Sequence, residues 1–356
     1  MTATRPAGLL TALAVLGLAA CGTQEQPAHD AEPSGNAPAQ AQPAATATEA
    51  IAAFERNFGV HAGLRRNHTK GVCAAGEFVG DPAARAISRA ALFSGASVPV
   101  VARFSLPGGN PDASDASPTP RGMALEFRLP DGSRQHMTML NVPVFSAATP
   151  QSFLDGLLAA TPDPATGKPD PERVRTYRES HPDTAPQAEF MQTYRPPASY
   201  ANSRYYGIHA FRFINADGVS TPVRWQFEPE DGERALEPAE MDRLPKTFLA
   251  QRLAERAARG PIRWQMRVVL GQPGDPTNDP TRAWPADRSS VMAGTLSLTA
   301  IGPQVGGECE GINFDPMVMT DGIGASDDPV LAFRSPAYAL SFARRLSEAA
   351  RSQAPH

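Results

Sequence analysis

Three strand-like stretches decide the fold: VPVVARFSL (residues 98–106), GMALEFRL (122–129) and HMTMLNVPVF (136–145). They are rich in β-branched and aromatic side chains, and the turn sequence Pro130-Asp131-Gly132 follows the second of them. Strands that are joined by short turns pair in antiparallel fashion. The three stretches therefore predict the centre of an antiparallel sheet.

Similar stretches along the chain extend this sheet. We expect further strands at residues 76–79, 208–214, 221–227, 262–270 and 295–300. Roughly seven or eight clustered strands favour a sheet that closes into a barrel. Helical periodicity is expected at residues 50–58, 152–158, 171–180, 185–194, 237–259 and 329–352. The predicted fold class is α+β, a closed antiparallel β-barrel core with surrounding helices.

The composition excludes several classes of protein. Of the 356 residues, 41% are hydrophobic and 20% are charged, so the chain is too apolar to be disordered. Three cysteines are too few for a disulfide framework, and a net charge of −4 offers no basic surface to nucleic acid. We therefore expect a folded core and no nucleic-acid partner.

The N-terminal residues have the composition of an export signal. Residues 1–21 contain Arg5, a short apolar run and the sequence Leu18-Ala19-Ala20-Cys21, which resembles a bacterial lipobox. Residues 22–47 lack large apolar side chains and are interpreted as a disordered tether, whereas residues 48–356 form the folded domain. We expect an exported, periplasmic protein that contacts the membrane only through a lipid on Cys21. An ordinary secretory signal or a cytosolic helix remains the alternative.

Familiar catalytic motifs are missing from the sequence. It contains no GxGxxG after a strand, no phosphate-binding loop, no HExxH and no GxSxG. A zinc site made of His61, His68 and Cys73 is an alternative, but it would require a loop to fold around the metal. The chemistry has to be sought in residues that are far apart in the sequence.

Several short segments together carry a resemblance. They are RRNHTKGVC (residues 65–73), ARFS (102–105), PRGMA (120–124), NVPVF (141–145), GIH (207–209), FDPMVMTDGIGASDDP (314–329) and RSPAY (334–338). In this order they resemble the haem catalases, and most closely the short periplasmic catalase-related peroxidases. The resemblance implies a catalase-type barrel that binds haem b. It also implies that the C-terminal helical domain of full-length catalases is absent.

The resemblance assigns one haem face to the RxxxY segment. It makes Tyr338 the axial ligand of the iron and Arg334 the partner that stabilises its phenolate. Arginine suits this position because its guanidinium keeps its charge in a dry site. Without the other segments, a helical Tyr338 with Arg334 four residues earlier would be interpreted as a surface pair.

The resemblance also assigns the catalytic residues of the other face. It makes His68 the acid and base for peroxide cleavage, Asn141 the amide that orients the peroxide, and Ser105 the group that fixes the histidine. An imidazole suits proton transfer because its usual pKa lies near neutrality. From the residues alone, His68 would be interpreted as a solvated loop histidine and Asn141 as a turn residue.

Other positions match cofactor-binding residues by the same resemblance. Arg65 and Arg103 match arginines that pair with haem propionates, and Arg345 is a third candidate. His209 matches a position on the proximal side, although a buried structural histidine is also compatible with its strand. Ser146 replaces a phenylalanine of large catalases, and Phe153 is expected to restore part of that wall.

Two further features of the sequence concern the cysteines and the C-terminal helix. Cys73 and Cys309 invite a disulfide in an exported protein, but Cys73 belongs to the KGVC stretch and could be a buried thiol. Asp328 and Pro329 are typical of a helix start, which places Pro336 inside the helix and predicts a kink before Tyr338.

The resemblance implies a haem peroxidase that uses hydrogen peroxide or an organic hydroperoxide, with a small organic reductant. A true catalase is the alternative enzyme, and a haem-binding lipoprotein without turnover is the alternative outside enzymes.

Overall fold

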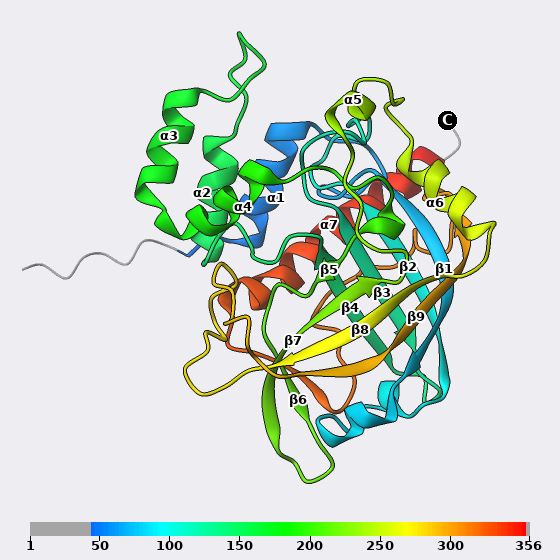
Figure 1. Ribbon diagram of the computed structural model, residues 1–356. Coiled ribbons are helices and arrows are strands. Elements are labelled where there is room, and N and C mark those ends of the chain that lie inside the picture. Colours follow the sequence, from blue (N-terminus) through cyan, green and yellow to red (C-terminus); the bar gives the residue numbers. More distant parts are fainter. Residues whose placement is uncertain (1–43, 354–356) are drawn as a thin grey trace, which may run out of the picture. The chain divides into compact units, whose positions relative to one another are not determined.

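The computed structural model describes residues 44–353, so the predicted signal and most of the predicted tether lie outside the described residues. An antiparallel barrel is its central element (Figure 1). Its ring contains β1 (Gly71–Gly80), β2 (Ser97–Ser105), β3 (Gly122–Arg128), β4 (Arg134–Leu140), β5 (Tyr205–Tyr206), β7 (Ser220–Pro229), β8 (Ile262–Leu270) and β9 (Ser290–Gly302). Pairing of β7 with β8 closes the ring, which confirms the predicted barrel.

Two short strands extend the sheet outside the ring. β6 (Phe211–Ile214) pairs with β7 through a hairpin, and β10 (Ile323–Ala325) pairs with β6. The sequence predicted the hairpin but did not predict β10, whose three residues are too few to show an alternating pattern. The predicted strand at residues 136–145 is also shorter than expected, because β4 ends at Leu140.

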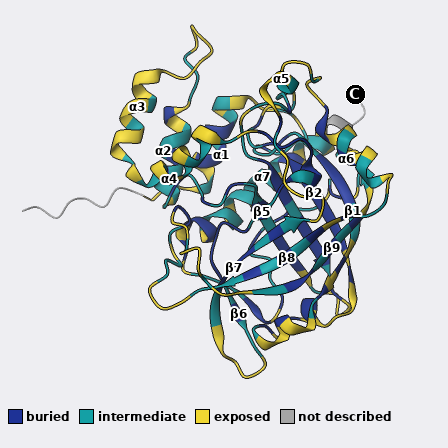
Figure 2. Cartoon of the chain, in the orientation of Figure 1, coloured by how far each residue is buried: buried dark blue, intermediate teal, exposed yellow. Residues whose placement is uncertain are grey.

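The interior of the barrel is filled by aromatic and aliphatic side chains, and Figure 2 shows buried residues along its strands. The Phe78 and Phe127 rings meet edge to face at a centroid distance of 5.3 Å, and Phe104 lies 5.8 Å from Trp264. Burial of one such side chain contributes about 1.5–3 kcal/mol. This core makes the strands a rigid support for whatever lies on their outer face.

The outer face of β1 to β4 presents two rows of directly opposed residues. One row is Cys73, Arg103, Ala124 and Thr138, and the other is Gly71, Ser105, Gly122 and Leu140. Opposed residues in neighbouring strands point to the same side of a sheet. Positions two residues apart share that side as well, so both rows face outward together.

Helices lie around the barrel (Figure 1). They are α1 (Ala47–Phe58), α2 (Pro150–Ala159), α3 (Pro171–Ser180), α4 (Ala185–Thr193), α5 (Pro238–Met241), α6 (Leu249–Ala257) and α7 (Pro329–Gln353). Helix α1 packs against α7 and α2. Its start is fixed by a capping box in which Thr46 and Glu49 bond each other's backbone amides.

One predicted helix is wrong. The sequence suggested a single helix at residues 237–259, but the structure has α5 and α6 with an irregular segment at residues 242–248 between them. Pro245 lies in that segment, and a proline inside a helix removes a hydrogen bond and clashes with the preceding turn. Helix α7, in contrast, runs from Pro329 through Pro336 without interruption.

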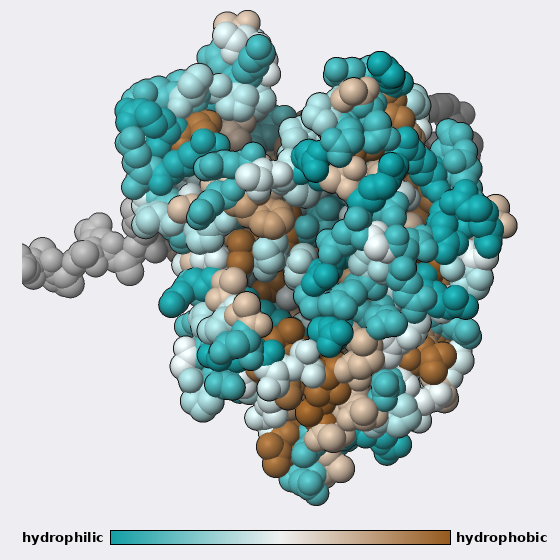
Figure 3. Space-filling model, viewed as in Figure 1, coloured by the Kyte–Doolittle hydropathy of each residue, from teal (hydrophilic) through white to brown (hydrophobic). Residues whose placement is uncertain are grey.

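The face shown in Figure 3 is mainly hydrophilic, and its apolar residues gather around the position of β6 and β7. Val219, in the turn between these strands, is 57% exposed. Within residues 44–353, no helix combines the length and the apolar character needed to cross a membrane.

Candidate active site

A cavity lies between helix α7 and the outer face of β2, β3 and β4. It measures about 1280 Å³, including the space that is open to solvent. One face of α7 lines it, with Phe333, Arg334, Ala337, Tyr338, Ser341, Phe342 and Arg345. These positions repeat every three to four residues and therefore form a single stripe along the helix.

Tyr338 and Arg334 meet inside this cavity. Arg334 donates from Nη2 to the Tyr338 Oη at 2.6 Å and to the Thr138 Oγ1 at 2.7 Å. Thr138 belongs to the outward-facing row of β4, so the strand fixes the guanidinium that holds the phenol. The contact between Tyr338 and Arg334 follows from their spacing of four residues on one helix.

A buried pair fixes the start of α7. Asp328 accepts hydrogen bonds from the backbone amides of Val330 and Leu331 at 2.8 and 3.2 Å, and its second oxygen lies 2.6 Å from His209 Nδ1. Burial lowers the pKa of His209, in spite of this carboxylate. His209 does not line the cavity, so its contact is with the helix cap. Its place favours a supporting role in positioning α7.

The loop that carries His68 has an unusual backbone. His68 has φ of 55°, and within residues 44–353 it is the single non-glycine residue with positive φ. Asn67 supports the turn, because its Oδ1 accepts from the amides of His68 and Gly108 at 2.9 and 2.7 Å. Strained conformations of this kind persist where the surrounding structure holds them, often at functional sites.

His68 points into the cavity next to Ser105. The His68 Nδ1 lies 2.9 Å from the Ser105 Oγ. A Cβ at Gly122 would lie 2.8 Å from that Oγ and 3.0 Å from the His68 Cε1, so only glycine leaves room for this pair. Burial, together with the charges of Arg103, Arg334 and Arg65, lowers the pKa of His68 to about 3. The imidazole is therefore neutral near pH 7.

Three arginines gather at another part of the cavity wall. They are Arg65 from the His68 loop, Arg103 from β2 and Arg345 from α7. Burial and repulsion by Arg103 and Arg345 lower the pKa of Arg65 to about 8, and burial lowers the pKa of Arg103 to about 10. Such a cluster of buried cations favours anionic groups in the cavity.

The donor atoms of this cluster fit the carboxylates of haem. Arg103 Nε and Arg345 Nη1 are buried and have no hydrogen-bond partner among the described residues. Buried donors normally have an acceptor, so these two atoms call for one from outside the chain. Together with the Tyr338 phenol and the apolar walls, they match an iron porphyrin with two propionates.

Asn141 lies outside the cavity wall. Its Oδ1 accepts from the Arg121 amide at 2.6 Å, and its Nδ2 donates to the Tyr194 hydroxyl at 3.1 Å and to the Ser203 Oγ at 3.4 Å. Leu140, the preceding residue, lines the cavity instead. The structure therefore brings His68 and Ser105 together but does not bring Asn141 to them.

Three aromatic rings form another part of the cavity wall. Phe153 from α2 lies 5.5 Å from the ring of Phe145 and 6.1 Å from the ring of Phe54 in α1. All three line the cavity, so Phe153 forms part of its wall. This wall is suited to an apolar or aromatic surface.

Cys73 and Cys309 form a disulfide, which decides between the two alternatives that the sequence left open. The bond also contradicts the zinc alternative, because Cys73 has no free thiolate. In the part of the chain that the structure describes, no cluster of three His, Cys, Asp or Glu side chains could hold a metal ion.

The sequence analysis did not identify three residues that lie near the site. Leu140 and Gly122 lie in the outward row of β3 and β4, and Gln304 bonds Arg103 from a distant loop. The first two could have been found from the alternation that places Ser105 on this face. Gln304 gave no local signal, since 201 residues separate it from Arg103.

Known proteins are similar to this chain in sequence. The family profile described as Catalase matches residues 23–354. A catalase-related peroxidase from Synechococcus elongatus is 52% identical over 300 residues, covering 84% of this chain and 88% of that protein. Another from Mycolicibacterium paratuberculosis is 37% identical over 313 residues, covering 87% of this chain and 98% of that protein.

Solved structures support the same fold. A fungal catalase and catalase A from Saccharomyces cerevisiae each match with a TM-score of 0.73 and 23% identity. The matches cover 83% of this chain and 62% or 63% of those chains.

Proposed function

The chain belongs to the catalase family, and from this premise we propose that it is a haem b peroxidase using hydrogen peroxide or organic hydroperoxides with a small organic donor. Its assignment as an oxidoreductase that acts on peroxide follows from the family and from the names of its relatives. The main support for a haem b peroxidase is a single cavity. The hydrogen-bonded pair Tyr338 and Arg334 lines this cavity, and so does the pair His68 and Ser105.

Four arginines and one tyrosine would hold the haem. The Tyr338 oxygen is the ligand offered to the iron, and the Arg334 hydrogen bond holds that oxygen in place. Arg65, Arg103 and Arg345 offer guanidinium donors to the two propionates. When bound, the haem iron supplies the redox chemistry for reducing the oxygen–oxygen bond of a peroxide.

His68 is the residue placed to move protons. Because its pKa is lowered to about 3, its ring enters the reaction neutral and can accept a proton from hydrogen peroxide. Ser105 holds Nδ1, which leaves Nε2 as the atom for proton exchange. The same atom can return the proton to the oxygen that leaves.

The wall of the cavity supports an organic donor or hydroperoxide. Phe54, Phe145 and Phe153 present aromatic surface to the cavity. Leu140, which lies directly opposite Gly122 in the neighbouring strand, adds an aliphatic side chain to the wall. Apolar surface of this kind favours aromatic or alkyl groups over water. A phenolic donor therefore suits this cavity.

The test begins with the spectrum of the purified protein after addition of haem, which should show a Soret band. Peroxide consumption is then measured with and without a phenolic donor while released oxygen is recorded. We expect consumption to depend on the donor, with little oxygen released. Rapid oxygen release without a donor would instead assign the true catalase activity, and a missing Soret band would overturn the proposal.

Variants of two histidines separate enzymatic turnover from haem binding. His68→Ala should keep the Soret band and lower donor oxidation by at least about 100-fold. His181→Ala is the control, because His181 lies at the end of α3 and does not line the cavity. Wild-type turnover in His68→Ala would contradict the proposed role and favour a site that binds haem without this base.

We also propose that the protein is exported to the periplasm and anchored through a lipid on Cys21. The support is the lipobox-like sequence alone, which lies outside the described residues. The wild-type protein should incorporate labelled fatty acid and sediment with membranes, whereas Cys21→Ala should do neither. Labelling of Cys21→Ala at the wild-type level would exclude this site.

A further inference from the structure

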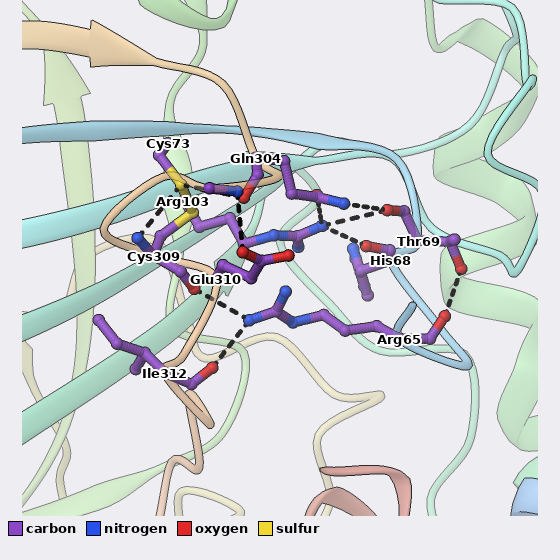
Figure 4. The surroundings of a disulfide bond; sticks show 10 residues. Arg65, His68, Thr69, Cys73, Arg103, Gln304, Cys309, Glu310 and Ile312 are labelled. Carbon is purple, nitrogen blue, oxygen red and sulfur yellow. Dashed lines mark hydrogen bonds between the residues drawn. A yellow bond between two sulfur atoms is a disulfide. The ribbon is translucent and has the colours of Figure 1, made fainter. Parts of the chain in front are cut away.

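Residues 304–312 form an irregular segment after β9 that reaches the arginines of the cavity (Figure 4). The disulfide joins Cys309 of this segment to Cys73 of β1. Cys73 lies directly opposite Arg103 in the neighbouring strand, so the crosslink and the arginine emerge side by side on the outer face. We call residues 304–312 the clamp segment.

The clamp segment holds two of the arginines by direct hydrogen bonds. Arg65 donates from Nη2 to the Cys309 carbonyl at 3.1 Å and to the Ile312 carbonyl at 2.8 Å. Arg103 donates to the Gln304 Oε1. Gln304 in turn donates from Nε2 to the Thr69 carbonyl at 2.9 Å.

The same contacts connect the arginines to the His68 loop. Arg103 also donates to the His68 carbonyl at 2.5 Å, next to the Thr69 carbonyl that Gln304 bonds. Gln304 therefore bridges β2 and the loop, as Figure 4 shows. In this way, one amide side chain restrains both Arg103 and the backbone beside His68.

Such restraint is needed because the guanidinium groups repel one another. The charges of Arg103 and Arg345 disfavour the charged form of Arg65, and the Glu310 charge in the clamp segment opposes them. Neutral acceptors such as carbonyls and an amide hold a guanidinium without cancelling its charge. Arg65 and Arg103 consequently remain cationic toward the cavity.

We propose that the clamp segment positions Arg65 and Arg103 for the carboxylates of bound haem, with Gln304 and the Cys73–Cys309 disulfide as its positioning groups. This inference rests on the proposed binding of haem. Loss of either positioning group should leave the arginines present but less well oriented, which weakens retention of a cofactor through its carboxylates.

The decisive measurement is the rate at which haem leaves the reconstituted protein for an excess of apomyoglobin. We expect Gln304→Ala to release haem about tenfold faster than wild type, the magnitude of one charge-assisted hydrogen bond. The measurement is repeated with haem dimethyl ester, whose propionates carry no charge. With the ester, Gln304→Ala and wild type should release the cofactor at nearly the same rate.

Two further variants complete the design. The double variant Cys73→Ser/Cys309→Ser should reproduce the effect of Gln304→Ala, while Val305→Ala, at a 66% exposed position in the same segment, should not change the rates. If the double variant does not fold, Gln304→Ala alone decides.

The outcomes separate this inference from the proposed function. If Gln304→Ala releases haem at the wild-type rate, or accelerates loss of haem and its ester equally, the clamp inference is overturned while haem binding stands. If wild type shows no Soret band, the failure lies in the proposed function.

Discussion

At the scale of single residues, the environment of His68 depends on the absence of a side chain at Gly122. Gly122→Ala places a methyl group 2.8 Å from the Ser105 Oγ and 3.0 Å from the His68 Cε1, so one of the two groups must move. We expect donor oxidation to fall by about 10- to 100-fold, because displaced proton-transfer groups lose much of their effect. Steady-state kinetics measures this loss.

The Gly122→Ala variant should still bind haem, as its Soret band will show. Gly302→Ala is the matched control, since a Cβ there meets nothing within 4 Å. Unchanged kinetics in Gly122→Ala would mean that the contact between His68 and Ser105 is not needed for turnover.

Asn141 gives a second prediction at this scale. Removal of its side chain in Asn141→Ala leaves the buried Arg121 amide without its acceptor, which should lower the free energy of unfolding by about 1–3 kcal/mol. Asn141→Asp keeps that acceptor and should lose less stability. Urea unfolding gives these values, and turnover of both variants should exceed that of His68→Ala. Turnover as low as that of His68→Ala with full stability would show a direct catalytic role.

At the scale of elements, the cavity exists because α7 crosses a part of the sheet where the outward side chain is small. Ala124 lies between Arg103 and Thr138 in one outward row and lines the cavity. Ala124→Leu should fill this space and lower haem affinity by at least about tenfold through steric overlap. A titration followed at the Soret band measures the affinity.

The barrel itself should tolerate Ala124→Leu, since the added atoms project outward from it. Ala300→Leu on β9, at an exposed position, serves as the control and should bind haem as wild type does. Equal affinity in both variants would show that the haem does not lie against Ala124.

Sequence alone predicted those contacts that depend on local spacing. The alternating pattern of the strands predicted the barrel, and the spacing of four residues on one helix predicted the contact between Arg334 and Tyr338. The bond between His68 and Ser105 spans 37 residues and was available only through the family resemblance. Helix propensity failed at residues 237–259, where Pro245 interrupts a favourable pattern. The contact of Gln304 with Arg103 could not be predicted, because the two residues are brought together only by the folded barrel and no pattern in the sequence relates them.

At the scale of the whole molecule, the free energy of unfolding depends on pH through two buried histidines. Burial lowers the pKa of both His68 and His209 below the usual value near 6.5 that the unfolded chain retains. Below that pH, the unfolded chain binds protons that the native chain does not bind. Stability is therefore full above pH 6.5 and must fall as the pH decreases.

This fall can be measured between pH 7 and pH 5. The carboxylates with lowered pKa values, such as Glu55 and Glu348, titrate below this window in the unfolded chain and contribute little there. Haem-free wild type should lose about 1–2 kcal/mol more than His68→Gln, which has no proton to bind at this position. Urea unfolding at both pH values provides the comparison. An equal loss in the two proteins would mean that burial does not lower the pKa of His68, so that the native chain takes up this proton between pH 7 and pH 5 as the unfolded chain does.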